Sequence, residues 1–383
     1  MLLARAGMRV LVIDRASFPS DTISGHFIKP AGVAWLARWG LLDKLTATGC
    51  PPIRRRSVHF GDEPFAIPSL PAGTLPALAP RRFVLDKMLL EAAQAAGAEV
   101  REGVAVSELV REGDRVVGVA TRDRAGARAS ERAEIVIGAD GRNSLVARRV
   151  AAPVYADIGA VSIGYYGYWS DFPADGLEVY FKKRRLVGLF PTHDHRVLAF
   201  VQWPIDERAA FKAALTANYL HSLRSVEPVA TRLADARLAE PIRGMVQLPN
   251  FFRRPFGEGW ALVGDAGHHK DPLVARGITD AWRDSQLLTD ALLGGWGSDA
   301  GLRDALAHYH HMRDRTAGQV AQLNARLARL DAPLETMAGL FAELAAAERA
   351  SDELFKGHPT HALSNTSTTS ATTRPAARSD RAR

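Results

Sequence analysis

The sequence has one cysteine, Cys50, in 383 residues, and it has no long run of apolar residues. A single cysteine excludes a disulfide framework and a metal site built on several cysteines, so a reducing cytoplasm is the compartment we expect. The longest apolar runs, around Val10–Ile13 and Ile135–Ile137, fall far short of the ~20 residues that cross a bilayer. No signal-peptide pattern opens the chain either. The sequence therefore predicts a protein without a membrane helix.

A strong excess of charge of one sign is also missing. The chain has 49 Lys and Arg against 42 Asp and Glu, and its basic residues are scattered apart from small clusters at Arg54–Arg56 and Lys182–Arg185. Nucleic-acid-binding proteins usually show a concentrated basic stripe within a recognisable module. We therefore expect no nucleic-acid partner. A content of 47% hydrophobic and 24% charged residues is typical of an ordinary globular chain.

Helical and strand patterns alternate along most of the chain, which favours an α/β fold. Met1–Ala6 reads as the end of a helix, Gly7 as its left-handed cap and Arg9–Asp14 as a buried strand. The segment from Cys50 to Pro80 is rich in proline and reads as loop. From Val161 to Trp203 the pattern is all strand, which indicates an antiparallel sheet inserted between the β–α–β pieces. The remaining predicted helices are 29–45, 83–97, 207–239, 277–293, 302–330 and 334–350, and the remaining predicted strands are 98–101, 104–110, 115–121, 134–138, 244–248 and 260–264.

Three motifs fall at the ends of predicted strands, where open α/β sheets bind their ligands. Asp14 ends the first strand, and an acid there can accept hydrogen bonds from a ribose, although a turn residue is the alternative reading. Ile135–Val150 is a buried strand that ends in Gly138-Ala139-Asp140-Gly141 and runs into a helix capped by Asn143 or Ser144. A helix N-terminus of this kind offers N–H donors to a phosphate.

The third motif, Trp260–Leu288, carries the strongest signal. A strand leads into Gly264-Asp265-Ala266-Gly267, then a loop with Pro272, and then a helix that begins at Gly277. Asp265 can accept a hydrogen bond from a ribityl hydroxyl, and the N–H groups of Gly277 and Ile278 can point at an electron-rich carbonyl. His268 and His269 read as polar loop residues, because no third ligand stands at the spacing of a zinc site. We therefore expect no metal.

With these motifs in order, the sequence resembles the FAD-dependent oxidoreductases similar to p-hydroxybenzoate hydroxylase, including their geranylgeranyl-reductase-like branch. The resemblance covers roughly residues 1–330. It implies a glutathione-reductase-type, Rossmann-like FAD-binding domain with an inserted antiparallel-sheet substrate domain and C-terminal helices. The implied division is 1–155 and 251–350 for the FAD-binding domain and 156–250 for the substrate domain. The Ser/Thr-rich composition from His358 onward predicts disorder, so we expect residues 351–383 to form a disordered tail. The implied cofactor-binding residues are Asp14, Arg15, Arg82, Val106, Asp140, Gly141, Gly264, Asp265, Pro272, Gly277 and Ile278.

Two departures from the family pattern stand out. The first strand and the G-x-G-x-x-G loop that holds the FAD pyrophosphate do not precede Arg9–Asp14 in this sequence. We expect either that about 20–30 further residues supply them, or that the strands Arg9–Asp14 and Glu134–Gly138 pair directly and the chain binds FAD poorly. In addition, Val274 stands where many members have glycine, so the loop beside the flavin is expected to be stiffer.

The resemblance implies an NAD(P)H-dependent flavin monooxygenase that hydroxylates or epoxidises a small organic substrate of aromatic or polyketide type. A flavin-dependent reductase of prenyl or other alkenes is the alternative, and a non-catalytic relative that binds FAD poorly is a third. No catalytic residue can be assigned from the sequence. Tyr165, Tyr166 and Tyr168 read as core or surface aromatics of the inserted sheet. The substrate and the oligomeric state stay undetermined.

Overall fold

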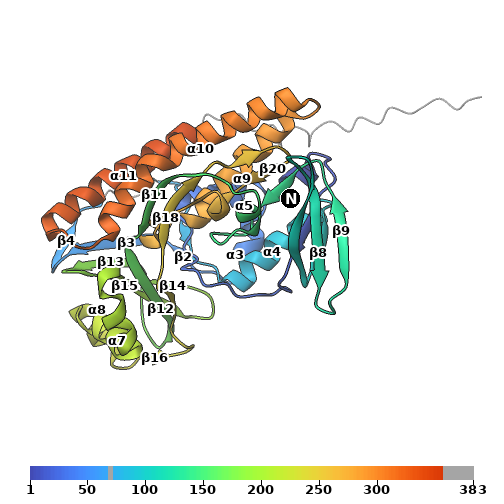
Figure 1. Cartoon of the computed structure of the whole chain (residues 1–383). Helices are drawn as coiled ribbons and strands as arrows, with labels where there is room; N and C mark the ends of the chain where they lie inside the picture. The colour runs from blue at the N-terminus through green and yellow to red at the C-terminus, as the bar shows by residue number, and fades with distance from the viewer. Residues whose placement is uncertain (68–71, 357–383) are drawn as a thin grey trace, which may run out of the picture.

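The computed structural model describes residues 1–67 and 72–356 (Figure 1). Its helices are α1 (Leu2–Arg5), α2 (Pro30–Arg38), α3 (Leu42–Thr46), α4 (Arg82–Ala95), α5 (Leu145–Arg149), α6 (Arg208–Ala213), α7 (Leu215–Arg224), α8 (Glu227–Leu233), α9 (Gly277–Gly295), α10 (Asp299–Ala328) and α11 (Leu334–Lys356). None of the described helices combines the length and the hydropathy needed to cross a membrane. The prediction of a disordered tail from residue 351 is wrong for residues 351–356: α11 continues to Lys356, and Ser351 and Phe355 are buried. The remainder of the expected tail lies outside the described residues.

The strands are β1 (Leu11–Asp14), β2 (Pro52–Ile53), β3 (Arg55–Phe60), β4 (Glu63–Phe65), β5 (Ala77–Leu78), β6 (Glu99–Glu102), β7 (Val104–Glu112), β8 (Arg115–Asp123), β9 (Arg128–Arg132), β10 (Val136–Gly138), β11 (Val154–Ala160), β12 (Ser162–Ser170), β13 (Gly176–Lys182), β14 (Arg185–Pro191), β15 (Val197–Pro204), β16 (Arg237–Leu238), β17 (Arg243–Met245), β18 (Pro249–Arg253), β19 (Phe256–Gly257), β20 (Trp260–Leu262) and β21 (His268–His269). The expected hairpin is present as β7–β8 with Gly113 at its turn, and Gly7 has the left-handed φ of 84° expected of a helix cap.

Two short parallel ladders form the part of the molecule that resembles a dinucleotide fold. β1 pairs with β6, and β10 pairs with β20, but within the described residues β1 and β10 belong to separate sheets. The direct pairing of these two strands that we considered from the sequence is therefore not observed. A cavity of about 320 Å³ is lined instead by Val10 next to β1, Ile137 of β10 and apolar residues of α1 and α9.

The two parallel ladders form one layer of the molecule, and a large mixed sheet forms the other. The strand order of this sheet is β16-β12-β15-β14-β13-β3-β4, and β17 pairs with β12. We predicted its antiparallel part, β12 to β15, from the strand pattern. The interpretation of residues 50–80 as loop is wrong for β3 and β4, because β3 pairs in parallel with β13. Proline-rich flanks hid this strand, whose side chains Val58 and Phe60 are buried. The division of the chain at residues 155 and 250 stays a prediction.

Helices cover both faces of the large sheet. α6, α7 and α8 pack on one face, where Tyr165 stacks on Phe211. α10 and α11 cover the other face at the β3–β13 end (Figure 1). At the β12–β15 end, Phe27 and residues of β2 and β5 pack on this face. The loop between β20 and α9, which we call the GD loop (Gly264–Arg276), is placed where the two layers meet.

Candidate functional site

Pairing of β10 with β20 brings two of the predicted motifs to one edge. The register sets Gly138 opposite Leu262, so Asp140 and Asp265 both follow the carboxyl ends of neighbouring parallel strands. Parallel strands in a sheet lie about 4.8 Å apart, and this edge is where open α/β sheets bind ligands. The structure therefore places the two acidic motifs side by side, as the sequence predicted.

Asp140 has a structural role that the sequence did not reveal. One oxygen of its carboxylate accepts hydrogen bonds from the backbone N–H groups of Leu145 (2.6 Å) and Val146 (3.3 Å), at the start of α5. Of the two capping residues that the sequence left open, Ser144 is the one used, and it accepts from the N–H of Ala147. Gly141 follows with a φ of 75°, which suits glycine. Asp140 therefore shapes the turn and has one oxygen left for a ligand.

Asp265 differs from Asp140, because its carboxylate has no hydrogen bond or ion pair among the described residues. The side chain is half-buried in a single turn of 3-10 helix (Gly264–Ala266). Gly264 has a φ of 59°, and a Cβ there would lie 3.2 Å from that of Ala281. A half-buried carboxylate that the protein leaves without a partner is suited to accept hydrogen bonds from a ligand.

The N-terminus of α9 is likewise open. Its N-cap residue, Arg276, makes no capping hydrogen bond, and Gly277 is exposed with no atom within 4 Å of an added Cβ. The first N–H groups of a helix have no partner within the helix, so those of Gly277 and Ile278 are available to an acceptor. In the preceding loop Pro272 is exposed, whereas Val274 is buried in the core beside α10. The left-handed residue of the loop is Ala275, with a φ of 52°.

The remaining predicted residues lie on several elements outside the GD loop. Asp14 accepts a hydrogen bond from the N–H of Ala16 (2.7 Å), and Arg15 is exposed. Arg82 begins α4 and donates to Asp86 (2.8 Å). Val106 of β7 packs partly against the core around β10 and β20. The structure thus does not gather these four residues on one ladder: Asp14 ends β1, Arg82 begins α4, and Val106 of β7 packs toward the β10–β20 side.

A network of buried ion pairs joins the GD loop to α9. Asp280 of α9 pairs with Lys270, with Arg276 (3.2 Å) and with Arg283 (3.0 Å), and all four residues are buried. Burial alone would raise the pKa of Asp280, but the three cations hold it well below its ordinary value. Arg276 also pairs with Asp352 of α11 (2.7 Å). The network therefore ties α11, α9 and the GD loop together.

His268 and His269 follow the alternation of a strand. His268 stacks on Phe252, and His269 stacks on Phe251, the residues opposite them in β18. Neighbouring strand residues point to opposite faces, so the two rings do not converge on one point. No group of three or more His, Cys, Asp or Glu side chains suited to a metal ion is found in residues 1–67 and 72–356.

Sequence reasoning missed a polar cluster under the large sheet. Tyr166 and Tyr168 are buried on the face opposite Tyr165, so all three tyrosines are core residues. His26 is hydrogen-bonded to the hydroxyl of Tyr168 (2.8 Å), and Arg81 lies 3.8 Å from the centre of the same ring. Burial, with help from nearby arginines, lowers the pKa of His26 to about 3, so the ring is neutral at physiological pH.

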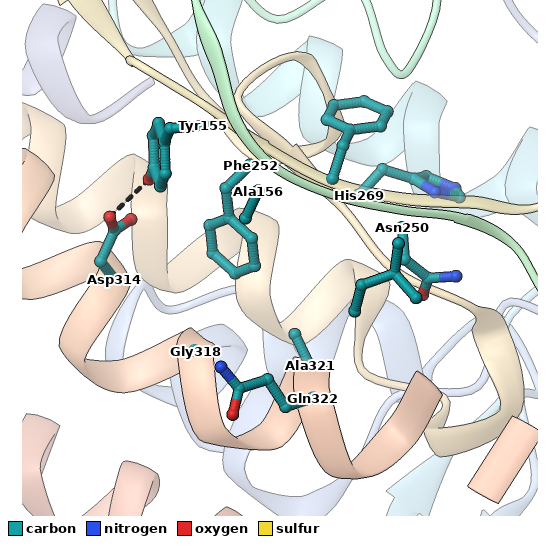
Figure 2. A pocket seen from close by; sticks show the side chains of 11 residues that line it. Tyr155, Ala156, Asn250, Phe252, His269, Asp314, Gly318, Ala321 and Gln322 are labelled. Atoms are coloured by element: carbon teal, nitrogen blue, oxygen red, sulfur yellow. Dashed lines mark hydrogen bonds between the residues drawn. The ribbon is translucent and has the colours of Figure 1, made fainter. Parts of the chain in front are cut away.

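A second cavity, of about 230 Å³, lies between the β11–β18–β21 sheet and α10. Figure 2 shows Tyr155 hydrogen-bonded to Asp314 at one end and Asn250 with His269 at the other. Phe252 and the small residues of α10 line the space between them. Asn250 accepts a hydrogen bond from the GD loop, and His269 is part of that loop, so the cavity adjoins the loop on the side of α10.

Comparison with known proteins agrees with this geometry. A model of the "FAD binding domain" family matches residues 1–324. The chain belongs to this family.

Curated relatives include enzymes of two kinds. One is 6-methylpretetramide 4-monooxygenase of Streptomyces rimosus, 26% identical over 305 residues, which are 74% of this chain and 69% of that protein. Another is digeranylgeranylglycerophospholipid reductase of Methanosarcina mazei, 30% identical over 219 residues, which are 55% of this chain. The chain matches about half the length of that reductase (51%).

Among solved structures, a triple mutant of the flavin-dependent brominase Bmp2 superposes with a TM-score of 0.79 at 20% identity, over 93% of this chain and 92% of that one. The predicted α/β FAD-binding fold is confirmed. The resemblance to FAD-dependent oxidoreductases found in the sequence is thus supported by membership of the FAD-binding family.

The observed donor set fits the ring and ribityl end of FAD. The unpartnered carboxylate of Asp265 and the uncapped start of α9 at Gly277 are separated by one loop, and Gly277 leaves open space at the helix start. At the pyrophosphate end, Arg82 can supply positive charge, whereas no turn with the G-x-G-x-x-G pattern joins a strand to a helix in the part of the chain that the structure describes. The roles of the individual residues are proposals.

Replacing Asp265 with alanine should weaken FAD binding about 10- to 150-fold. This corresponds to the roughly 1.5–3 kcal/mol that a hydrogen bond to a charged group contributes. Quenching of flavin fluorescence on titration with the protein measures the dissociation constant. Asp206→Ala, which removes an exposed carboxylate of the large-sheet layer, is the control and should bind as the wild type does. Equal affinity of the D265A protein would remove Asp265 from the site.

Replacing Asp280 with alanine should lower the free energy of unfolding by about 3–5 kcal/mol, because three buried cations lose their shared partner. Asp352→Ala removes a partly exposed partner of Arg276, so a loss of at most about 1 kcal/mol is expected. Urea unfolding monitored by circular dichroism measures both. Similar losses in the two variants would show that the network does not depend on Asp280.

Proposed function

We propose that this protein is a cytoplasmic NAD(P)H-dependent FAD monooxygenase that inserts oxygen into a small aromatic or polyketide-like substrate. The observation that carries the proposal is the pairing of β10 with β20, which brings the two acidic turns of the family's FAD-binding motifs to one edge. The similarity to 6-methylpretetramide 4-monooxygenase over most of both chains supports the same class.

The roles of the chain's own residues follow from the geometry. Asp265 would accept a hydrogen bond from the ribityl chain, the N–H groups of Gly277 and Ile278 would hold the electron-rich edge of the ring, and Arg82 would bind toward the phosphates. When bound, FAD supplies the transfer of electrons from the nicotinamide to dioxygen. His26, neutral and buried, would serve to fix the hydroxyl of Tyr168.

A reductase of prenyl or other alkenes is the second candidate. The specific observation in its favour is the 30% identity to the digeranylgeranylglycerophospholipid reductase of Methanosarcina mazei, over about half of that enzyme. Both candidates use the same cofactor edge, so the structure of the GD loop does not distinguish them. The single buried cysteine, Cys50, is compatible with the reducing compartment that we propose.

The two candidates differ in their need for dioxygen. FAD-reconstituted protein is incubated with NADPH or NADH and a panel of polyketide phenols under ¹⁸O₂, and in parallel with a geranylgeranyl glycerolipid under anaerobic conditions. We expect a product that carries one ¹⁸O atom and forms only with oxygen. Anaerobic saturation of the lipid double bonds, without any ¹⁸O-labelled product, would instead establish the reductase. The D265A protein should lose either activity.

A further inference from the structure

A buried carboxylate in the GD loop joins the loop to the large sheet. Asp271 has no exposed surface. One of its oxygens accepts from the hydroxyl of Ser162 on β12, and the other accepts from the side-chain amide of Gln202 on β15 (2.6 Å) and from the N–H of Leu273 (3.0 Å). Gln202 also donates to the Ser162 hydroxyl oxygen (2.6 Å). Two strands of the sheet therefore meet on a single carboxylate.

The backbone around Asp271 is fixed from two further elements. Its N–H donates to the amide oxygen of Asn250 on β18 (2.8 Å), and its carbonyl accepts from Asn324 on α10 (2.8 Å). Asn324 also accepts from the N–H of Val274 (3.1 Å). Both asparagines are buried. The two side-chain amides thus provide the hydrogen bonds that the buried backbone of the loop cannot make with water.

The anchored segment leads directly to the open helix start. After Asp271 come one turn of 3-10 helix (Pro272–Val274), then Ala275 in the left-handed conformation, and then α9 from Gly277. The left-handed conformation is unfavourable for alanine, and it is kept only where neighbouring contacts fix the backbone in it. The hydrogen bonds of Asp271 and Asn324 fix the backbone before Ala275, so they set the direction of the first N–H groups of α9.

The environment of Asp271 is polar but uncharged. The side chains that face it from β12, β15, β18 and α10 are Ser162, Gln202, Asn250 and Asn324, and Asp271 has no ion pair among the described residues. Burial raises its pKa to about 6, although the hydrogen bonds from Ser162, Leu273 and Gln202 act in the opposite direction. Both protonation states are therefore populated near pH 6.

We propose that Asp271 is a positioning residue that couples the large sheet to the edge of the bound flavin through the GD loop. A change in its protonation redistributes the hydrogen bonds that Ser162 and Gln202 share with it, and the loop carries this change to the N–H groups of Gly277 and Ile278. The proposal rests on FAD binding at the GD loop. It holds equally for a monooxygenase and for a reductase, so its failure is distinguishable from failure of the proposed function.

A pH titration of the bound flavin tests the coupling. The visible absorption spectrum of the FAD-bound protein should change with a midpoint near pH 6, because the charge and hydrogen bonding beside the ring change there. The isosteric variant Asp271→Asn should bind FAD but lack this transition. Ser162→Ala, which removes a hydrogen bond to the ionised carboxylate, should shift the midpoint upward by about one unit. Asp206→Asn is the control and should titrate as the wild type does.

Hydrogen exchange provides a second readout that does not depend on the flavin. Without the carboxylate in Asp271→Ala, the amides of Leu273 and Val274 should exchange about tenfold faster. In Asp271→Asn, which keeps an oxygen acceptor for Leu273, the rates should change much less. An unaltered flavin titration in the D271N protein, or unaltered exchange in the D271A protein, would overturn the proposal. Should D271A fail to fold, D271N and S162A decide the question by the flavin titration.

Discussion

The parallel pairing of β10 with β20 is the constraint on which the candidate site depends. It fixes Gly138 opposite Leu262, and so it places two acidic turns, from segments more than a hundred residues apart, at one edge. Everything between the two strands in sequence, including most of the large sheet, is inserted above this edge. The GD loop then has to pass from β20 to α9 under the sheet, where Asp271 meets Ser162 and Gln202.

Two kinds of polar interaction hold the loop, and they have different consequences. Below it, the ion pairs of Asp280 with Lys270, Arg276 and Arg283 join charged groups that are all buried, so each depends on the others. On the side of the large sheet, the carboxylate of Asp271 accepts hydrogen bonds only from neutral donors. It is therefore protonated more easily than the ion-paired Asp280. The ion pairs of Asp280 hold the loop rigidly, whereas the hydrogen bonds of Asp271 can respond to protonation.

Much of the fold could be predicted from the sequence because its patterns are local. Gly7, the Gly113 hairpin and the strand–Gly-Asp–helix order around Asp265 each specify a short piece of backbone. The failures concern contacts between distant segments. β3 was hidden by its proline-rich flanks, and its parallel pairing with β13 is not a local property. The contacts of Asp271 with Ser162 and Gln202 join segments 69 to 109 residues apart, and no local pattern predicts them. The polar Gln202 within an apolar strand is a signal that could have indicated a buried partner.

A crystal structure of the protein grown with FAD tests the central claim most directly, namely that the edge formed by β10 and β20 binds the flavin. We predict electron density for the ribityl chain at the carboxylate of Asp265, with the ring edge at the N–H groups of Gly277 and Ile278. FAD bound elsewhere, with Asp265 remote from it, or a protein that crystallises without FAD at saturating concentration, would contradict the account.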